Sequence, residues 1–254
     1  LYPLSLSEII LSDKVSENVA IQNEKTKNLL PQILLYGSYP EIYLEKSVEN
    51  KVLFLNKIIE SYLYKDIFEF QKVRNPQAIR DLTRALAYQV GSEVNENELS
   101  SRLAVDRKTI VSYLDLLEKT FVIYKLYPFS KNRRREIGKN YKVYFLDLGL
   151  RNGLIGDFNP LSLRPDAGAL WENYLIIERQ KLFANIGEKP EGRFWRSYQG
   201  AEVDYLEIKE TNKLCAFEIK YGFGKLSKSA GAFFRNYQTR VKLVNNNNFL
   251  DFLK

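Results

Sequence analysis

The alternation of apolar and polar residues late in the chain predicts two neighbouring β-strands. We expect an outgoing strand over residues 201–208, a tight turn, and a returning strand over residues 214–221. Side chains alternate between the two faces of a strand, so Glu218 and Lys220 should share one face. Asp204 should then lie beside Glu218 across the strand pair.

These side chains have the chemistry of a metal site. Carboxylates at Asp204 and Glu218 would repel each other unless a cation neutralised them, and oxygen ligands favour a hard ion such as Mg²⁺. A metal ion can activate water and polarise a phosphate oxygen, while Lys220 orients the nucleophile or stabilises negative charge. Glu202 is an alternative ligand, since alternation places it on the face of Asp204. The chemistry indicated is phosphodiester hydrolysis; the alternative is a solvated sheet edge.

A helical pattern precedes this hairpin. Residues 168–179 place Trp171, Tyr174 and Leu175 at helical spacing. Glu172 lies on the same predicted helix. The alternative for Glu172 is an ordinary exposed carboxylate on a helix.

The set formed by Asp204 and Glu218-Ile219-Lys220 resembles the motif of restriction-endonuclease-like nucleases of the PD-(D/E)XK type. The resemblance implies that Asp204 and Glu218 hold Mg²⁺ and act with Lys220 in catalysis. Glu172 matches the acidic residue that this superfamily carries on a preceding helix, where it would support a ligand or a metal-bound water. Val203 stands where the motif often has proline, which keeps a non-catalytic, degenerate nuclease fold as an alternative.

Three helices and a strand hairpin are predicted in the middle of the chain. Asn75, Asn95 and Asp106 are placed as helix N-caps, and apolar stripes follow each of them. Residues 121–127 and 141–145 read as strands. Three helices followed by a hairpin describe a winged helix.

Basic side chains make nucleic acid a candidate partner of this region. Between Lys125 and Lys142, both included, there are seven Lys/Arg and one acid. In a winged helix the third helix can enter a major groove while the wing contacts phosphates. The candidate DNA contacts are Arg107, Lys108, Tyr113, Lys131, Arg133, Arg134 and Arg135. The alternatives are a solvated basic loop and a purely structural or protein-docking module.

Composition narrows the chemistry further. The 254 residues are 45% hydrophobic with a net charge of +7, which suits a globular protein with a polyanionic partner. The absence of histidine excludes histidine bases and Ser/His or Cys/His nucleophiles. No apolar run reaches the length of a membrane span, and we expect a cytoplasmic protein without a membrane partner.

Several short segments together resemble a widespread prokaryotic family of AAA-type ATPases. These segments are LYPLS at 1–5, GSYPE at 37–41, YKDI at 64–67, DRKTI at 106–110, LLEK at 116–119, DLGLRN at 147–152 and WEN at 171–173. Members of the family combine a P-loop ATPase, a winged helix and a C-terminal restriction-endonuclease-like domain. The chain contains no G-x-x-x-x-G-K-[ST], so no nucleotide-binding residue is assigned and ATP is expected only for an upstream module. The absence of methionine, with Leu1 first, also indicates missing upstream sequence.

The resemblance implies a multidomain α/β architecture. We expect a helical ATPase remnant and connecting helix over 1–72, a winged helix with a basic wing over 73–150, and a restriction-endonuclease-like mixed sheet with flanking helices over 151–254. The predicted function is nucleic-acid binding with a candidate Mg²⁺-dependent endonuclease site. The alternatives are a non-catalytic DNA- or protein-binding regulatory module and a transcription regulator acting through the winged helix. A homo-oligomer or another protein partner is also compatible with these readings.

Overall fold

The chain divides into two compact units that do not follow the sequence order. The computed structural model describes residues 3–12, 19–66, 75–130, 140–188, 190–208 and 213–254. One unit comprises Leu1–Val90, Asn95–Tyr124 and Tyr144–Pro165, and the other comprises Gly91–Val94, Lys125–Val143 and Asp166–Lys254. The predicted α/β class is confirmed. The predicted three-part division, with boundaries after residues 72 and 150, stays a prediction.

The first unit is built mainly from helices. In chain order they are α1 (Leu6–Ser12), α2 (Val19–Tyr36), α3 (Pro40–Leu44), α4 (Val48–Ile58), the π-helix η1 (Ile59–Asp66), α6 (Pro76–Tyr88), α7 (Glu96–Leu103), α8 (Arg107–Lys119), α9 (Leu148–Ile155) and the short 3₁₀ helix η3 (Leu161–Leu163). The apolar stripes of these helices form the core of the unit.

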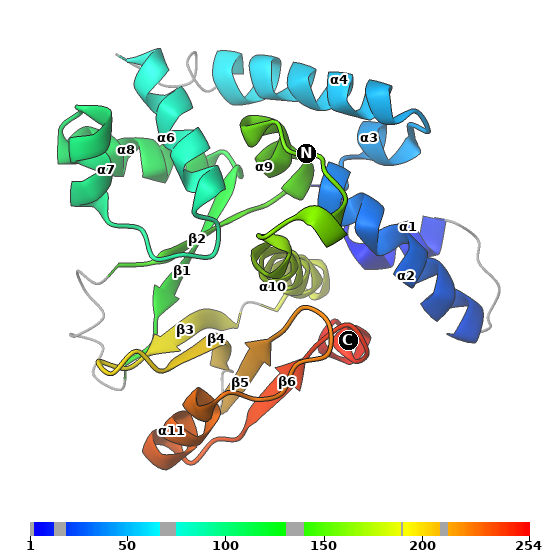
Figure 1. Ribbon diagram of the computed structural model, residues 1–254, viewed down its shortest axis with the longest axis vertical. Helices are drawn as coiled ribbons and strands as arrows, with labels where there is room; N and C mark the ends of the chain where they lie inside the picture. Colours follow the sequence, from blue (N-terminus) through cyan, green and yellow to red (C-terminus); the bar gives the residue numbers. More distant parts are fainter. Residues whose placement is uncertain (1–2, 13–18, 67–74, 131–139, 189, 209–212) are drawn as a thin grey trace. The chain divides into compact units, whose positions relative to one another are not determined.

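The second unit contains most of a mixed sheet whose strand order is β2-β1-β3-β4-β5-β6 (Figure 1). Its elements are α10 (Ala167–Ile186), β3 (Glu191–Arg196), β4 (Glu202–Ile208), β5 (Leu214–Ile219), α11 (Lys228–Tyr237), β6 (Val241–Val244) and α12 (Phe249–Phe252). The remaining strands, β1 (Ile123–Pro128) and β2 (Lys142–Phe145), each begin in one unit and end in the other. β4 pairs antiparallel with β3 and β5, whereas β1–β3 and β5–β6 are parallel pairs.

Local capping signals place the middle helices as predicted. The side chain of Asn75 accepts a hydrogen bond from the backbone N–H of Ala78 and begins α6. Asn95 caps α7, and Asp106 caps α8 by accepting from the backbone N–H of Thr109. These caps satisfy N–H groups that have no partner within a helix, which is why single polar residues fix the helix starts.

Two details of the predicted winged helix differ. Tyr113 of α8 is a predicted DNA contact, but its side chain is buried and its hydroxyl lies 3.3 Å from the backbone nitrogen of Asn75. Tyr113 therefore belongs to the packed face of α8. The strand β1 pairs with β3 through Tyr127 and Arg193, so it belongs to the larger sheet rather than to an isolated wing.

A buried carboxylate organises the first unit. Asp147 caps α9 by accepting from the backbone N–H of Leu150 at 2.9 Å, and it also accepts from the backbone N–H of Ser38 at 2.8 Å. Gly37 has φ +77° and lies so close that a Cβ there would collide with the Asp147 carboxylate. The glycine and the aspartate, far apart in sequence, are therefore required together.

The end of the same DLGLRN segment connects α9 to two other helices. The Asn152 amide donates to the carbonyl groups of Leu34 and Leu35 in α2, at 2.9 and 2.8 Å. Arg151 donates through Nε to the carbonyl of Ala87 in α6 at 2.7 Å. Both side chains are buried, so these contacts satisfy groups that would otherwise destabilise the core.

We predict that Asp147→Ala lowers the free energy of unfolding by about 2–4 kcal/mol, because it removes a helix cap and leaves two N–H groups without an acceptor. The matched control is Asp106→Ala, which removes an exposed cap and should cost about 1 kcal/mol. Urea unfolding followed by circular dichroism measures both values. Equal losses in the two variants would show that the buried contact to Ser38 adds no stability.

Candidate active site

The predicted strand hairpin is present and brings Asp204 to the E-x-K segment. β4 and β5 pair antiparallel in a register that joins Tyr205 to Phe217. Immediately beyond this pair, the Asp204 carboxylate accepts a hydrogen bond from the backbone N–H of Ile219 at 2.7 Å. Asp204 therefore lies beside the backbone between Glu218 and Lys220, as the spacing predicted.

A β-bulge alters the alternation that the sequence suggested. The register of β3 and β4 joins Arg193 to Leu206 but Trp195 to Val203, so β4 carries one extra residue between these pairs. Val203 and Leu206 consequently lie in the same apolar cluster, packed with residues of α11. Simple alternation would have placed those two side chains on opposite faces. The extra residue falls in the segment that contains Asp204.

Glu218 is buried under the loop that follows β5. Its carboxylate accepts from the backbone N–H of Ser227 at 3.0 Å and from the Ser227 hydroxyl at 3.1 Å, and the Lys220 ammonium lies 3.0 Å away. Ser227 is also the N-cap of α11. A Cβ at Gly224 would lie 2.6 Å from Cβ of Lys220, so glycine permits the loop to fold against the lysine. Ser227 carried no signal in the sequence that linked it to Glu218.

Lys142, at the start of β2, was predicted as part of the basic run that contacts phosphates, but it is a buried residue of the site. Its ammonium is buried, 2.5 Å from a Glu202 oxygen and 3.3 Å from a Glu172 oxygen. It also lies 5.4 Å from the centre of the Phe194 ring. The available signal was a lysine at the start of a short apolar strand. Glu172 is accordingly a partly buried, paired carboxylate rather than a freely exposed one.

Asp204 differs from the neighbouring acidic residues in having a strongly raised pKa. Burial, followed by repulsion from Glu172, raises the pKa of Asp204 to about 7. The hydrogen bond from Ile219 and the charges of Lys142 and Lys220 act in the opposite direction and do not fully compensate. Asp204 is therefore a carboxyl group whose ionised form would gain from additional positive charge.

The two lysines are held in their charged forms. Burial alone would lower the pKa of Lys142, but Glu172, Glu202 and Asp204 raise it above its ordinary value. Burial likewise opposes the charge of Lys220, while its hydrogen bond to Glu218 and the nearby carboxylates raise its pKa. Both side chains are therefore cations at neutral pH.

The structure brings the predicted catalytic residues together in part. Lys220 contacts Glu218 and lies within electrostatic reach of Asp204 and Glu172, whereas Glu202 pairs with Lys142. Among the described residues, no group of three or more His, Cys, Asp or Glu side chains is arranged to hold a metal ion. Mg²⁺, however, is commonly held by one or two carboxylates together with water and substrate phosphate. Asp204 and Glu218 on adjacent strands, with the raised pKa of Asp204, fit that smaller donor set.

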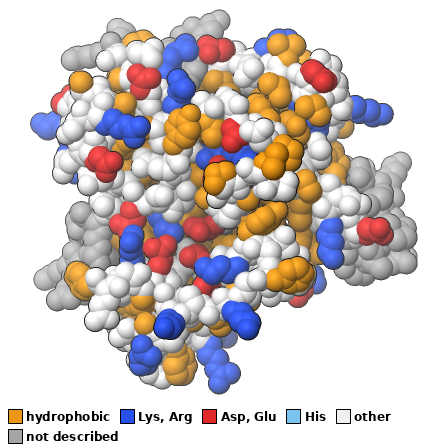
Figure 2. Space-filling view, viewed as in Figure 1, with side chains coloured by type: hydrophobic (Ala, Val, Ile, Leu, Met, Phe, Trp, Pro, Cys, Tyr) orange, Lys and Arg blue, Asp and Glu red, His pale blue; other side chains and the backbone are white. Residues whose placement is uncertain are grey.

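Other ion pairs of the unit have a structural role. Arg179 of α10 pairs with the buried Glu207 of β4 at 2.7 Å and donates to the carbonyl of Phe252 at 2.6 Å. These contacts fix α10 to β4 and α12. Figure 2 shows acidic and basic side chains mixed in one area of the face in view, and Lys and Arg side chains alone near its lower edge.

The predicted nucleic-acid contacts are only partly described. The Arg107 side chain is largely exposed and pairs with Glu96 at 2.6 Å, and Lys108 is exposed as well. Tyr113 is buried and does not present its ring for a base contact. The four basic-run residues, Lys131, Arg133, Arg134 and Arg135, lie outside the described residues. Over the part of the chain that is described, no helix is long and apolar enough to cross a membrane.

Comparison with known proteins finds families without an assigned function. A family model described as Domain of unknown function (DUF8612) matches residues 27–161, and one described as Domain of unknown function (DUF4143) matches residues 167–249. No solved structure matches the chain significantly.

The curated relatives are uncharacterized proteins. One from Haemophilus influenzae is 29% identical over 61% of this chain and 39% of its own length. Two from Methanocaldococcus jannaschii are each 25% identical, over 82% and 58% of this chain and over 45% and 32% of their own lengths. The chain therefore spans less than half the length of these relatives.

We predict that the raised pKa of Asp204 makes stability fall as pH rises from about 4 to about 7. In that range the folded protein retains a proton on Asp204 that the unfolded chain has lost, so raising the pH favours unfolding. Asp204→Asn should match the wild type near pH 4 and be the more stable protein at pH 8. Urea unfolding in EDTA between pH 4 and pH 8 measures the difference.

The matched control is Asp251→Asn, which changes a carboxylate whose side chain is 77% exposed. The difference in unfolding free energy between Asp251→Asn and the wild type should stay nearly constant from pH 4 to pH 8, whereas the difference for Asp204→Asn should grow. Parallel pH profiles for Asp204→Asn and the wild type would contradict the assignment.

Proposed function

The chain belongs to the family described as Domain of unknown function (DUF8612), and we propose that it binds nucleic acid and cleaves phosphodiester bonds with Mg²⁺. The observation that carries the proposal is the position of Asp204 on the backbone N–H of Ile219, between Glu218 and Lys220. This places one carboxyl group that is short of positive charge beside a second carboxylate and a protonated lysine. A restriction-endonuclease-like arrangement would use these groups together.

Asp204 and Glu218 would hold the ion in this proposal. When bound, Mg²⁺ supplies an activated water and polarises a phosphate oxygen. Lys220 is kept protonated by its carboxylate neighbours, so it donates hydrogen bonds to the attacking water or to developing negative charge rather than removing a proton. Glu172 acts on Asp204 by raising its pKa, and therefore favours cation binding at that carboxyl group.

The proposed substrate follows from charge. The net charge of +7 includes Arg133, Arg134 and Arg135, three consecutive arginines suited to phosphate contact. Arg107 and Lys108 at the start of α8 are exposed and add cationic contacts if α6–α8 with β1 and β2 act as a winged helix. From the family resemblance we further propose that the chain acts together with a P-loop module, which would supply ATP hydrolysis and couple it to this site.

A second function, binding without cleavage, is favoured by Lys142. Its ammonium lies between Glu172 and Glu202, where it already neutralises two of the acids. Lys220 does the same for Glu218. In this alternative the unit is a DNA- or protein-binding regulatory module with a degenerate nuclease fold.

We predict that Asp204→Ala and Lys220→Ala each lower the rate of Mg²⁺-dependent DNA cleavage by about 100-fold or more. The aspartate variant removes a metal ligand, and the lysine variant removes a donor to the reacting groups. Gel assays of labelled single-stranded and duplex DNA, with and without EDTA, measure the rates. Circular dichroism establishes that each variant remains folded.

The control for this assay is Asp251→Ala, because the Asp251 side chain is exposed in the same unit. It should cut at the wild-type rate. Undiminished cleavage by the Asp204 and Lys220 variants would contradict the proposed site. A wild-type chain that binds DNA but never cuts it would instead support the regulatory module.

We predict that the triple variant Arg133→Gln, Arg134→Gln, Arg135→Gln weakens DNA binding and flattens its salt dependence. Each lost contact to a duplex phosphate should reduce the slope of log K against log salt concentration by about 0.9. Fluorescence anisotropy at several salt concentrations measures the slope. A triple Lys→Gln variant at the exposed residues Lys119, Lys213 and Lys254 makes the same charge change as a control. An equal effect of both triple variants would show that only net charge matters.

A further inference from the structure

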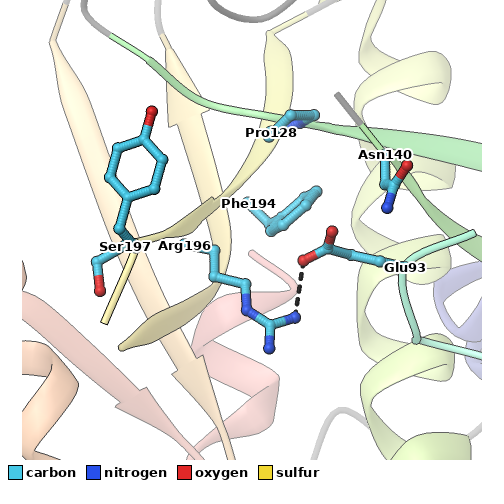
Figure 3. Close-up of a pocket in the computed structure, with 7 residues that line it drawn as sticks. Glu93, Pro128, Asn140, Phe194, Arg196 and Ser197 are labelled. Carbon is cyan, nitrogen blue, oxygen red and sulfur yellow. Dashed lines mark hydrogen bonds and ion pairs between the residues drawn. The ribbon is translucent and has the colours of Figure 1, made fainter. Parts of the chain in front are cut away.

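A cavity of about 360 Å³ opens in the second unit (Figure 3). It is lined by Glu93, Pro128, Asn140, Phe194, Arg196, Ser197 and Tyr198. Its volume lies near the lower end of the range of about 300–1,000 Å³ that small-molecule sites occupy. The cavity is therefore large enough for a single planar ring system.

Aromatic and apolar groups form part of this lining. The Phe194 side chain is almost completely buried, and Figure 3 shows it between Pro128 and the polar residues of the cavity. Tyr198 is 95% exposed, which is unusual for a large aromatic side chain that lines a cavity. Its turn is held by the backbone hydrogen bond from Ser197 to the carbonyl of Ala201 at 2.8 Å. Tyr198 thus places an exposed aromatic ring at the rim of the cavity, on a turn held by this hydrogen bond.

The polar lining argues against an anion as the occupant. Arg196 donates to Glu93 at 2.8 Å, and its Nε lies 3.8 Å from a Glu202 oxygen. The cation is therefore already neutralised, and a phosphate in the cavity would meet the Glu93 carboxylate. A neutral ligand with both donors and acceptors, by contrast, can hydrogen-bond Glu93, Arg196 and the Asn140 amide.

The cavity is linked to the candidate active site by charged contacts. Arg196 contacts Glu202, and Glu202 pairs with Lys142 at 2.5 Å. The Lys142 ammonium also lies 5.4 Å from the centre of the Phe194 ring that lines the cavity. The cavity is thus connected to the ion pairs around Lys142 through Arg196 and Glu202.

We propose that this cavity binds an unpaired nucleobase, and hence that single-stranded nucleic acid is the preferred ligand of the unit. The inference deepens the proposed function and rests on its nucleic-acid partner, but not on cleavage. A free base offers a flat π face for Tyr198 and a hydrogen-bonding edge for Glu93 and Asn140. In a duplex the faces are stacked and the edges are paired, so the base must leave the helix before it can enter.

Binding in EDTA tests the proposal independently of cleavage. Fluorescence anisotropy is measured for a labelled single-stranded oligonucleotide and for a duplex of the same length. Tyr198→Ala should weaken single-strand binding by about 10-fold, as expected for the loss of one base–aromatic stack, and leave duplex binding unchanged. Tyr198→Phe should bind the single strand like the wild type, because it retains the ring.

The control is Tyr88→Ala, which removes another exposed aromatic side chain, on α6. It should not alter the preference between single strand and duplex. Unchanged single-strand binding by Tyr198→Ala, equal weakening of both ligands, or no binding of single strands by the wild type would each overturn the proposal. Selective loss of single-strand binding in a chain that does not cut would leave the base site standing while the cleavage proposal fails.

Photo-crosslinking gives the second measurement. An oligonucleotide carrying one 5-iodouracil is irradiated with the wild-type chain, and the modified peptide is identified by mass spectrometry. The crosslink should fall on Tyr198, the exposed aromatic residue of the lining. A crosslink confined to other peptides would place the base elsewhere and overturn the assignment.

Discussion

The buried ammonium of Lys142 is the interaction on which the site depends. A lysine removed from water is strongly destabilising unless carboxylates compensate it, and here Glu172 of α10 and Glu202 of β4 do so at 3.3 and 2.5 Å. The pairs therefore join a helix and two strands as well as neutralising charge. Loss of either carboxylate would leave the buried ammonium with one partner instead of two, so these residues are constrained together. Burial and the charge of Glu172 raise the pKa of Asp204 by more than the hydrogen bond from Ile219 and the charges of Lys142 and Lys220 lower it.

The same contacts continue into the neighbouring cavity, and the proposed base site depends on them. Charges alternate from Lys142 to Glu202, then to Arg196 and Glu93. Alternation keeps the local net charge small although the chain as a whole is basic. A phosphate backbone would thus be attracted to the chain by its overall charge, whereas the cavity itself favours a neutral, hydrogen-bonding ring. In the proposal, the affinity for nucleic acid would come from the net charge of the chain, and the selectivity for an unpaired base would come from the lining of the cavity.

Sequence predicted those features that depend on local chemistry. The caps at Asn75, Asn95 and Asp106 and the hairpin around Asp204 follow from short-range hydrogen bonding and alternation. The β-bulge at Asp204 could not be predicted, because it depends on pairing with β3, and the role of Lys142 depends on residues far along the chain. Tyr113 shows the same limit, since its partner is the backbone of Asn75. The conformation or the environment of each of these residues depends on contacts with residues distant in sequence, which local patterns do not contain.

The state of Glu218 connects the two candidate functions. Its oxygens already accept from Ser227 and lie beside the Lys220 ammonium. Ser227 is the N-cap of α11 and contacts Glu218 partly through its backbone N–H, so it cannot leave without moving the start of the helix. The Lys220 side chain, by contrast, is 40% exposed. Lys220 is therefore the donor that can leave Glu218 with the smaller structural change. Its departure would remove one of the two contacts of that Glu218 oxygen, which also accepts from the backbone N–H of Ser227 at 3.1 Å, and would release the lysine toward a substrate. If Lys220 instead stays on Glu218, the two groups remain neutralised by each other, as the proposed binding module would require.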